Sequence, residues 1–320
     1  MSLLKQTILI LSLLSVPIFL YLRKRVDMTK YSGSYAVITG ATGGVGLEIC
    51  RQASRTHKLI LLDRNAEALD KLSAKYPESL TFCFDFTSSL LDFAPKFDDF
   101  LLKNKVDKNE IAVCFSNAGH GYFHAFHETD FAHKKRFMQV NVDAHVAISD
   151  YFLKIFVQKN ACHENGNKNQ KNLKNQKKSA LIFTASTLSY IPMWNFQMYH
   201  TAKTALSSLA NALYAEYRPL GIDVHAVHPY SIKNSQFNYH QDMCMFGRHV
   251  NVDQFKLSVS PWRIVDLVFR RLGKTSGSHA GVAALYFAIL SSLGRNFVGV
   301  YSVAFLDYSR KLRRRAKNVQ

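Results

Sequence analysis

Short apolar runs alternate with amphipathic stretches between Tyr35 and Val227. Each run is followed by a polar residue, a pattern typical of strands buried on both faces of a parallel sheet. The runs are Tyr35–Ile38, Lys58–Leu62, Leu80–Phe84, Ile111–Ser116, Ala180–Ala185 and Ile222–Val227. The alternation predicts a single α/β domain over residues 31–275, with a doubly wound parallel sheet and helices on both faces.

The first run leads into the glycine-rich segment Thr39–Gly46. The pattern predicts a strand ending at Thr39, a turn from Gly40 to Gly46 and a helix over Val45–Ala53. Glycines leave backbone N–H groups open, and a helix N-terminus favours phosphate, so this context predicts a Rossmann-type dinucleotide site. The residues expected to hold the cofactor here are Gly40, Thr42, Gly44, Val45 and Gly46. A glycine-rich loop without a ligand is the alternative.

The second and third runs end at residues that suit the adenosine half of a dinucleotide. Asp63 can accept both ribose hydroxyls, which favours NAD, whereas Arg64 can pair with the 2′-phosphate of NADP. Because Asp63 would repel that phosphate, NAD is the expected cofactor and NADP stays open. Asp85 and Phe86 are expected at the adenine edge, and a helix N-cap is the alternative role for Asp85.

The reaction centre is expected at Tyr199, Lys203, Ser186 and Asn141. Tyr199 and Lys203 are four residues apart, so both lie on one face of a helix. The lysine charge is expected to lower the pKa of the tyrosine towards the working range and make it a general acid and base. Ser186 is expected to hydrogen-bond the substrate oxygen, and Asn141 to lie on a helix beneath the site, linked to Lys203 through a water. Taken alone, each of these residues could instead have a purely structural role.

Together these residues resemble the motifs of the short-chain dehydrogenase/reductase family, over roughly Tyr31 to Lys274. The resemblance implies that Asn117, Ala118 and Gly119 line the adenosine ribose. It also implies catalytic roles for Asn141, Ser186, Tyr199 and Lys203, with Ser186 and Tyr199 contacting substrate and Tyr199 and Lys203 also contacting the cofactor.

By the same resemblance, the loop after the sixth run grips the nicotinamide through Pro229 and the backbone of Ile232. The family usually has glycine where this chain has Tyr230, and Asn234 stands where the family often has threonine. The helices of Asn141 and Tyr199 often pair in dimers of the family, so a homodimer is an open expectation.

The N-terminal residues predict a membrane anchor over residues 1–25. Leu3–Leu22 is an almost uncharged apolar stretch near the length of about 20 residues that a bilayer requires. No small-residue cleavage site follows it, which favours an anchor over a signal peptide. Since Arg23–Arg25 outweigh Lys5, the enzyme domain is expected in the cytosol, and the endoplasmic reticulum is the default membrane in a eukaryote.

The remaining C-terminal segment, residues 276–320, is apolar up to Leu306 and then basic. Arg295 divides its apolar part into halves too short to span a bilayer, so interfacial helices or a lid over the substrate cleft are expected. The net charge of +18 is concentrated in the insertion Lys159–Lys178 and in the tail Arg310–Lys317. Neither carries the aromatic residues of a single-strand binder, so anionic lipid and not nucleic acid is the expected contact of the tail. No metal constellation is evident.

These features predict a membrane-anchored NAD(P)-dependent oxidoreductase that interconverts a lipophilic alcohol and its carbonyl. Steroids, retinoids and long-chain lipids fit equally. The alternative is a non-catalytic nucleotide-binding scaffold at a membrane, supported by Tyr230 and the lysine-rich insertion.

Overall fold

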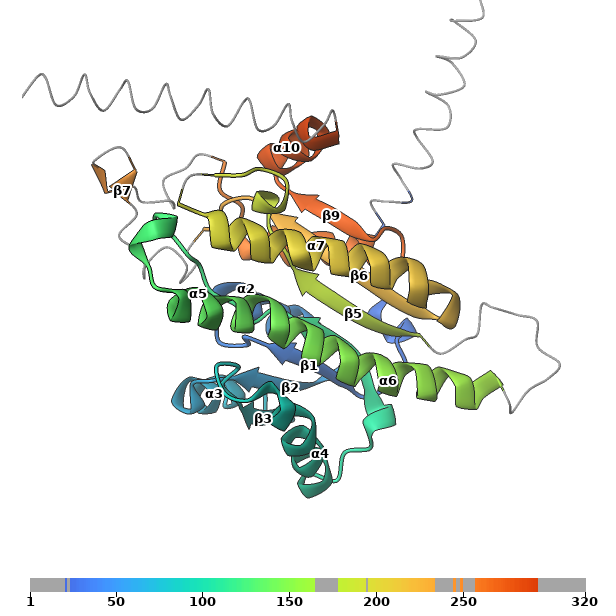
Figure 1. Ribbon diagram of the computed structural model, residues 1–320. Coiled ribbons are helices and arrows are strands. Elements are labelled where there is room, and N and C mark those ends of the chain that lie inside the picture. The colour runs from blue at the N-terminus through green and yellow to red at the C-terminus, as the bar shows by residue number, and fades with distance from the viewer. Residues whose placement is uncertain are drawn as a thin grey trace, which may run out of the picture.

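The fold is a seven-stranded parallel sheet in the order β3-β2-β1-β4-β5-β6-β9, shown by a computed structural model (Figure 1). The structure describes residues 21, 24–164, 178–193, 195–233, 244–245, 248–249 and 257–292. The strands are β1 (Tyr35–Thr39), β2 (Lys58–Asp63), β3 (Leu80–Cys83), β4 (Ile111–Ser116), β5 (Ser179–Thr184), β6 (Ile222–Pro229) and β9 (Gly277–Ala280). The pair β7 (Cys244–Met245) and β8 (Arg248–His249) lies apart from this sheet. The predicted doubly wound parallel α/β sheet is confirmed.

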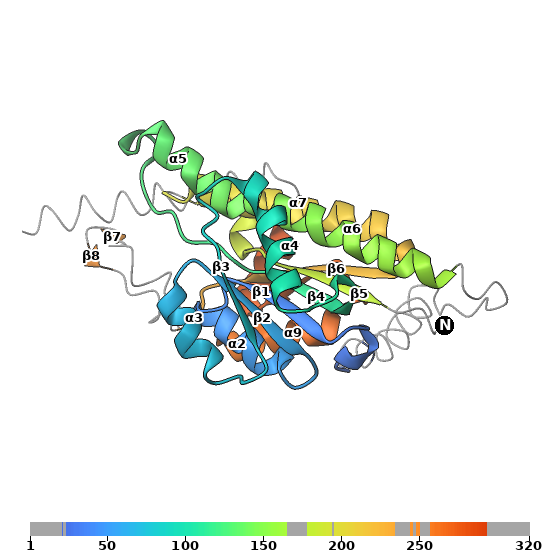
Figure 2. The same ribbon diagram turned by 90° about the horizontal axis from the view of Figure 1, so that it is seen from below.

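Helices cover both faces of the sheet, as Figure 2 shows. One face carries α4 (Phe93–Lys103), α6 (Ala144–Glu164) and α7 (Gln197–Tyr217). The other face carries α2 (Gly44–Ala53), α3 (Ala66–Ser73) and α9 (Pro261–Arg271). The helices α5 (Phe131–Met138) and α10 (Val282–Ser292) lie towards the carboxyl ends of the strands.

The sheet reverses its direction of winding between β1 and β4, which pair directly although β2 and β3 come between them in the chain. In doubly wound sheets, ligands bind outside the carboxyl ends of the strands at such a switch point. The glycine-rich turn follows β1, and Asn117–Gly119 follow β4, so both motifs meet there.

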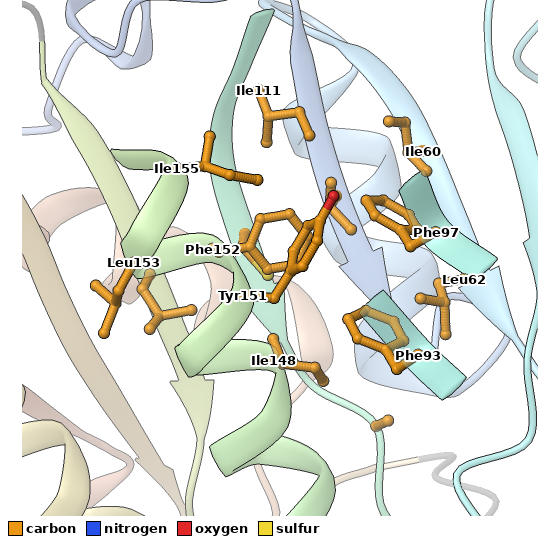
Figure 3. Packing of buried hydrophobic residues seen from close by; sticks show 14 of the residues in the cluster. Ile60, Leu62, Phe93, Phe97, Ile111, Ile148, Tyr151, Phe152, Leu153 and Ile155 are labelled. Atoms are coloured by element: carbon orange, nitrogen blue, oxygen red, sulfur yellow. The ribbon is translucent and has the colours of Figure 1, made fainter. Parts of the chain in front are cut away.

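Aromatic side chains fill much of the core beneath α4 and α6. Phe93 and Phe97 stack at 5.6 Å between centroids, and Tyr151 meets both rings edge-on (Figure 3). The Tyr151 hydroxyl leaves this cluster and donates to Asp98. Burial of these rings contributes roughly 25 cal/mol per Å² of apolar surface removed from water, so this layer adds substantially to the stability of the fold.

The segment that precedes the sheet is bound to the face of α9 and to β6. Arg25 pairs with Asp266 at 2.6 Å, and the Tyr31 hydroxyl donates to Asp223 at 2.8 Å. Tyr31 is 1% exposed. The chain that leaves the expected anchor is therefore held firmly against the domain.

In the part of the chain that the structure describes, no helix combines the length and the apolar character needed to cross a membrane. The expected span Leu3–Leu22 lies outside the described residues, apart from Tyr21. Asn234, residues 165–177 of the insertion and residues 293–320 also lie outside them.

Candidate active site

The glycine-rich turn has no space for side chains at two of its glycines. Gly40 has a φ of +62°, and a Cβ there would lie 2.9 Å from the Cα of Ala118. A Cβ at Gly46 would lie 2.1 Å from the carbonyl oxygen of Gly40. The turn closes tightly onto the first turn of α2, whose N-cap is Gly43 and which makes no side-chain capping bond. Gly44 and Val45 open the helix, and the first N–H groups of a helix have no partner within it, as a phosphate cradle requires.

Asn117 connects the turn to the neighbouring strands. Its amide nitrogen donates to the carbonyls of Thr39 and Gly40, both at 3.2 Å, and the Thr184 hydroxyl donates to its amide oxygen at 2.8 Å. The Thr39 hydroxyl accepts from the backbone N–H groups of Asn117 and Ala118, both at 2.9 Å. The predicted residues at the ends of β1 and β4 are therefore brought together.

Asp63 ends β2 and bonds the glycine-rich turn directly. One carboxylate oxygen accepts from the backbone N–H of Thr42 at 3.1 Å and from its hydroxyl at 2.7 Å. The other accepts from the backbone N–H groups of Arg64 and Asn65 at 2.8 and 3.4 Å. Arg64 itself is exposed.

The two residues expected at the adenine edge differ in their surroundings. Asp85 is exposed and accepts from the backbone N–H of Thr87 at 2.9 Å. It therefore orders a turn and caps no helix, since the N-cap of the following α4 is Asp92. The ring of Phe86 is buried and packs on Phe84 at 5.4 Å.

Ser186, Tyr199 and Lys203 converge beyond the carboxyl end of β5. The Ser186 hydroxyl hydrogen-bonds the Tyr199 phenol. The Lys203 ammonium lies 5.6 Å from the centroid of the Tyr199 ring, so the two share a face of α7 as predicted. It donates to the carbonyl of Thr184 at 2.8 Å.

Asn141 lies in a single π-turn, Gln139–Asp143, between α5 and α6. The side chain is fully buried and accepts from the backbone N–H of His120 at 3.2 Å. A Cβ at Gly119 would lie 2.8 Å from its amide oxygen and 3.7 Å from the Lys203 nitrogen. Glycine at 119 therefore leaves room for the Asn141 amide beside this loop. Isolated π-turns often occur at functional sites, and sequence periodicity gave no signal for this one.

The electrostatics of the site differ from the sequence expectation. Burial raises the pKa of Tyr199 to about 12, although the bond from Ser186 opposes this rise. Burial also lowers the pKa of Lys203 to about 8. The pKa of Tyr199 is therefore raised and not lowered as expected, because burial of the phenol disfavours the charged phenolate.

The loop after β6 accommodates Tyr230 in place of glycine. The ring stacks on Phe287 of α10, with centroids 6.3 Å apart, and the backbone N–H donates to the carbonyl of Ala280 at 3.3 Å. Pro229 ends β6, and Ile232 forms a bridge with Val259. The larger side chain of Tyr230 thus packs against α10, and the loop keeps its bridge to Val259.

Thr184 is a site residue that sequence reasoning missed. Its carbonyl holds Lys203 and its hydroxyl holds Asn117, so it joins the reaction centre to the nucleotide turn. The available signal was a polar residue at the carboxyl end of an otherwise apolar strand.

The fold and these side chains define an oxidoreductase that acts on alcohols or carbonyl compounds. Residues 34–243, more than half of the chain, match the short chain dehydrogenase family. The protein belongs to this family and is a dehydrogenase or reductase.

Two relatives illustrate the range of the family around this chain. The very-long-chain 3-oxoacyl-CoA reductase of Meyerozyma guilliermondii is 25% identical over 319 residues, covering 93% of this chain and 84% of that protein. The human inactive hydroxysteroid dehydrogenase-like protein 1 is 23% identical over 216 residues, covering 67% of this chain and 60% of that protein.

Among solved structures, a short chain dehydrogenase/reductase from Burkholderia phymatum in complex with NAD has a TM-score of 0.64 to this chain. The two are 19% identical, and the match covers 82% of this chain and 93% of that one. At this identity the likeness establishes the fold alone.

Proposed function

We propose that the protein is an NAD(P)-dependent reductase that converts a lipophilic ketone to its alcohol, with Tyr199 as the proton donor. The observation that carries the proposal is a partly buried phenol bonded to Ser186 and close to the Lys203 ammonium. With a pKa near 12 the phenol holds its proton at neutral pH, which is the form that carbonyl reduction requires.

The residues of the glycine-rich turn fit a dinucleotide. A Cβ at Gly40 or Gly46 would clash with neighbouring backbone atoms, so only glycine allows this tight turn, and the N-terminus of α2 that follows suits a pyrophosphate. The loops of Asn117–Gly119 and Pro229–Ile232, together with Lys203, would hold the ribose and nicotinamide ends. When bound, the nicotinamide supplies the hydride for the carbonyl carbon.

The protein side chains account for the proton. Ser186 and Tyr199 donate hydrogen bonds to the carbonyl oxygen, and the Tyr199 proton moves to that oxygen as the carbon is reduced. The phenolate that remains lies near the Lys203 ammonium, which stabilises its charge. The reduction rate is therefore expected to fall above pH 8, where Lys203 loses its charge.

The proposed substrate class is a ketone on a long apolar chain, such as a 3-oxoacyl thioester. It is supported by the Meyerozyma guilliermondii relative, which aligns over nearly the whole chain, and by the apolar helix α10 at the carboxyl ends of the strands. Its side chains Val282 and Ile289 are 80% and 56% exposed, which suits contact with lipid.

We also propose that residues 1–25 anchor the protein in a membrane and that the catalytic domain faces the cytosol. Resistance of the full chain to carbonate extraction would support the anchor, and release would contradict it.

The test of the activity is oxidation of reduced nucleotide by the detergent-solubilised full chain, with long-chain 3-oxoacyl-CoA, steroid ketones and retinal as substrates. Tyr199→Phe and Ser186→Ala are expected to bind nucleotide as the wild type does and to lose at least about 99% of turnover. Turnover by Tyr199→Phe at the wild-type rate would refute the assignment. Nucleotide binding by the wild type without turnover of any of these substrates would favour the scaffold alternative, whose argument from Tyr230 is weakened by the packing of that residue on Phe287.

A further inference from the structure

We propose that the edge of the sheet formed by β9 rests on an anionic lipid bilayer. A cluster of basic residues at the amino end of β9 would contact the lipid headgroups, and the apolar helix α10 at its carboxyl end would enter the interface. The proposal rests on the membrane anchor proposed above and adds which face of the domain meets the bilayer and which charge the lipid carries.

Basic side chains that are far apart in the sequence gather near the amino ends of β6 and β9. This basic cluster comes from the segment before β1, the end of α9 and the loop before β9, and consists of Lys24, Arg25, Lys30, Arg270, Arg271 and Lys274. Lys30 pairs with Asp223, the second residue of β6, at 3.1 Å. Burial lowers the pKa of Lys274, and the charges of four other members lower it further, so the cations are close neighbours.

The acidic residues nearby leave the basic cluster with an excess of positive charge. Asp266 is shared by Arg25 at 2.6 Å and Arg270 at 2.7 Å, and Asp27 accepts from Thr29. Among the residues that the structure describes, no carboxylate pairs with three members of the cluster, Lys24, Arg271 and Lys274. Unneutralised cations beside a membrane attract anionic lipid headgroups.

The basic cluster lies where the chain leaves the proposed anchor. Tyr21 and Lys24 are the first residues that the structure describes, and Lys274 donates to both of their carbonyls at 2.6 Å. The Lys274 nitrogen also lies 4.6 Å from the centroid of the Tyr21 ring. The end of an anchor over residues 1–25 would therefore be held beside the cluster, which brings these cations to the membrane surface.

Helix α10 presents an uncharged apolar stripe to solvent at the other end of β9. The stripe consists of side chains that are about half exposed or more, at the spacing of one helix face: Val282 (80%), Leu285 (51%), Tyr286 (49%) and Ile289 (56%). The opposite face packs on the domain, because Ala284 is fully buried and Phe287 stacks on Tyr230. No charged residue occurs in α10, so the stripe suits the apolar side of a bilayer interface.

The basic cluster and the stripe lie along the same edge of the domain. β9 is an edge strand with β6 as its neighbour, and it connects the loop of Lys274 to α10 (Figure 1). Its four residues span only about 13 Å at 3.3 Å per residue, so one flat membrane could contact both features. A bilayer against α10 would also lie near the loop of Tyr230, which gives a lipophilic ketone a route from the membrane to the reaction centre.

The experiment places a tryptophan on α10 of the full chain and measures its quenching by brominated phosphatidylcholine in vesicles that also contain phosphatidylserine. The wild-type emission of the two native tryptophans is subtracted. Val282→Trp is expected to lose most of its added emission, because the stripe would lie at the boundary of the acyl chains. Quenching no greater than that of the control would overturn the proposal.

Leu102→Trp is the matched control. Leu102 is 78% exposed, much like Val282, and lies on α4. The rings of α4 pack on Phe82 of β3, which is the strand at the opposite edge of the sheet. A tryptophan at Leu102 should therefore keep its emission in the same vesicles.

The basic cluster is tested by combining Lys24→Gln and Arg271→Gln with Val282→Trp. Quenching should be weaker in phosphatidylcholine alone than with phosphatidylserine, and the two glutamines should remove this dependence on lipid charge. Lys71→Gln with Lys103→Gln, which change exposed lysines on α3 and α4, should leave it unchanged. Persistence of the dependence without Lys24 and Arg271 would overturn the role of the cluster.

These measurements are independent of the proposed reaction. An active reductase whose Val282→Trp stays unquenched would contradict only the membrane-facing edge. A quenched but inactive chain would contradict only the proposed function. Release of the chain by carbonate would contradict the anchor alone, because quenching at neutral pH also reports a peripheral contact.

Discussion

Replacing Lys203 by methionine is expected to make the protein more stable while abolishing its activity. Lys203 is 5% exposed, and burial lowers its pKa from 10.5 to about 8. Each pKa unit corresponds to 1.36 kcal/mol, so holding the ammonium charged in the fold costs about 3 kcal/mol. The substitution also removes the bond to the Thr184 carbonyl, a loss of about 1 kcal/mol. The net gain in the free energy of unfolding at pH 7 is about 2 kcal/mol.

The assay is urea unfolding of the detergent-solubilised chain at pH 7, 8, 9 and 10, beside measurement of turnover. Between the folded pKa of about 8 and the unfolded value of 10.5, the unfolded wild type binds more protons than the folded one. The stability of the wild type therefore rises with pH in this window, and the advantage of Lys203→Met should shrink there. Lys71→Met is the control, because Lys71 is exposed and pairs with Glu67 on the surface, so its replacement should change stability by less than about 0.5 kcal/mol.

A Lys203→Met variant that is no more stable than the wild type at pH 7 would refute the argument from burial. A stability gap that stays constant from pH 8 to pH 10 would refute it equally.

Three further predictions concern the turn, the loop after β6 and the buried histidines. Gly46→Ala should abolish nucleotide binding in a fluorescence titration, because its Cβ would lie 2.1 Å from a backbone carbonyl; unchanged affinity would contradict this geometry. Tyr230→Gly should release Phe287 and speed proteolysis of α10, and Tyr230→Phe should behave as the wild type in the same assay, since the contact is between rings. Burial lowers the pKa of His225 to about 4 and that of His228 to about 3, so their unfolded forms bind more protons below pH 6.5. Stability should therefore fall as pH falls from about 6.5 to 4, measured by circular dichroism, and His228→Gln should reduce this slope.

Much of the fold could be predicted from the sequence, because a parallel strand buried on both faces leaves a continuous apolar run. The strands predicted from Tyr35, Lys58, Leu80, Ile111 and Ile222 begin at those residues, and their ends shift by at most a few residues. The strand β9 was missed, since Gly277–Ala280 is short and polar enough to resemble a loop. The interruption of α5 and α6 at Asn141 was missed for a related reason, because one π-turn scarcely changes the spacing of apolar residues.

Much of the candidate site could also be predicted, because its motifs consist of residues that are close together in the sequence. Tyr199 and Lys203 share one helix, so their common face follows from helical geometry, and Gly40–Gly46 span one turn whose contacts are mostly local. The identity of the family follows from the order of these motifs along the chain.

Tertiary structure alone decided how the same residues behave. The Asp63 carboxylate, which the sequence predicted to face a ribose, accepts hydrogen bonds from Thr42, 21 residues away, and only the tertiary structure shows this contact. The direction of the Tyr199 pKa depended on how much water the surrounding elements exclude, and the tolerance of Tyr230 depended on Phe287 of α10. Periodicity and spacing specify which residues share a helix or strand. The hydrogen-bond partners of a side chain and its exclusion from water depend on atoms brought together from distant parts of the chain.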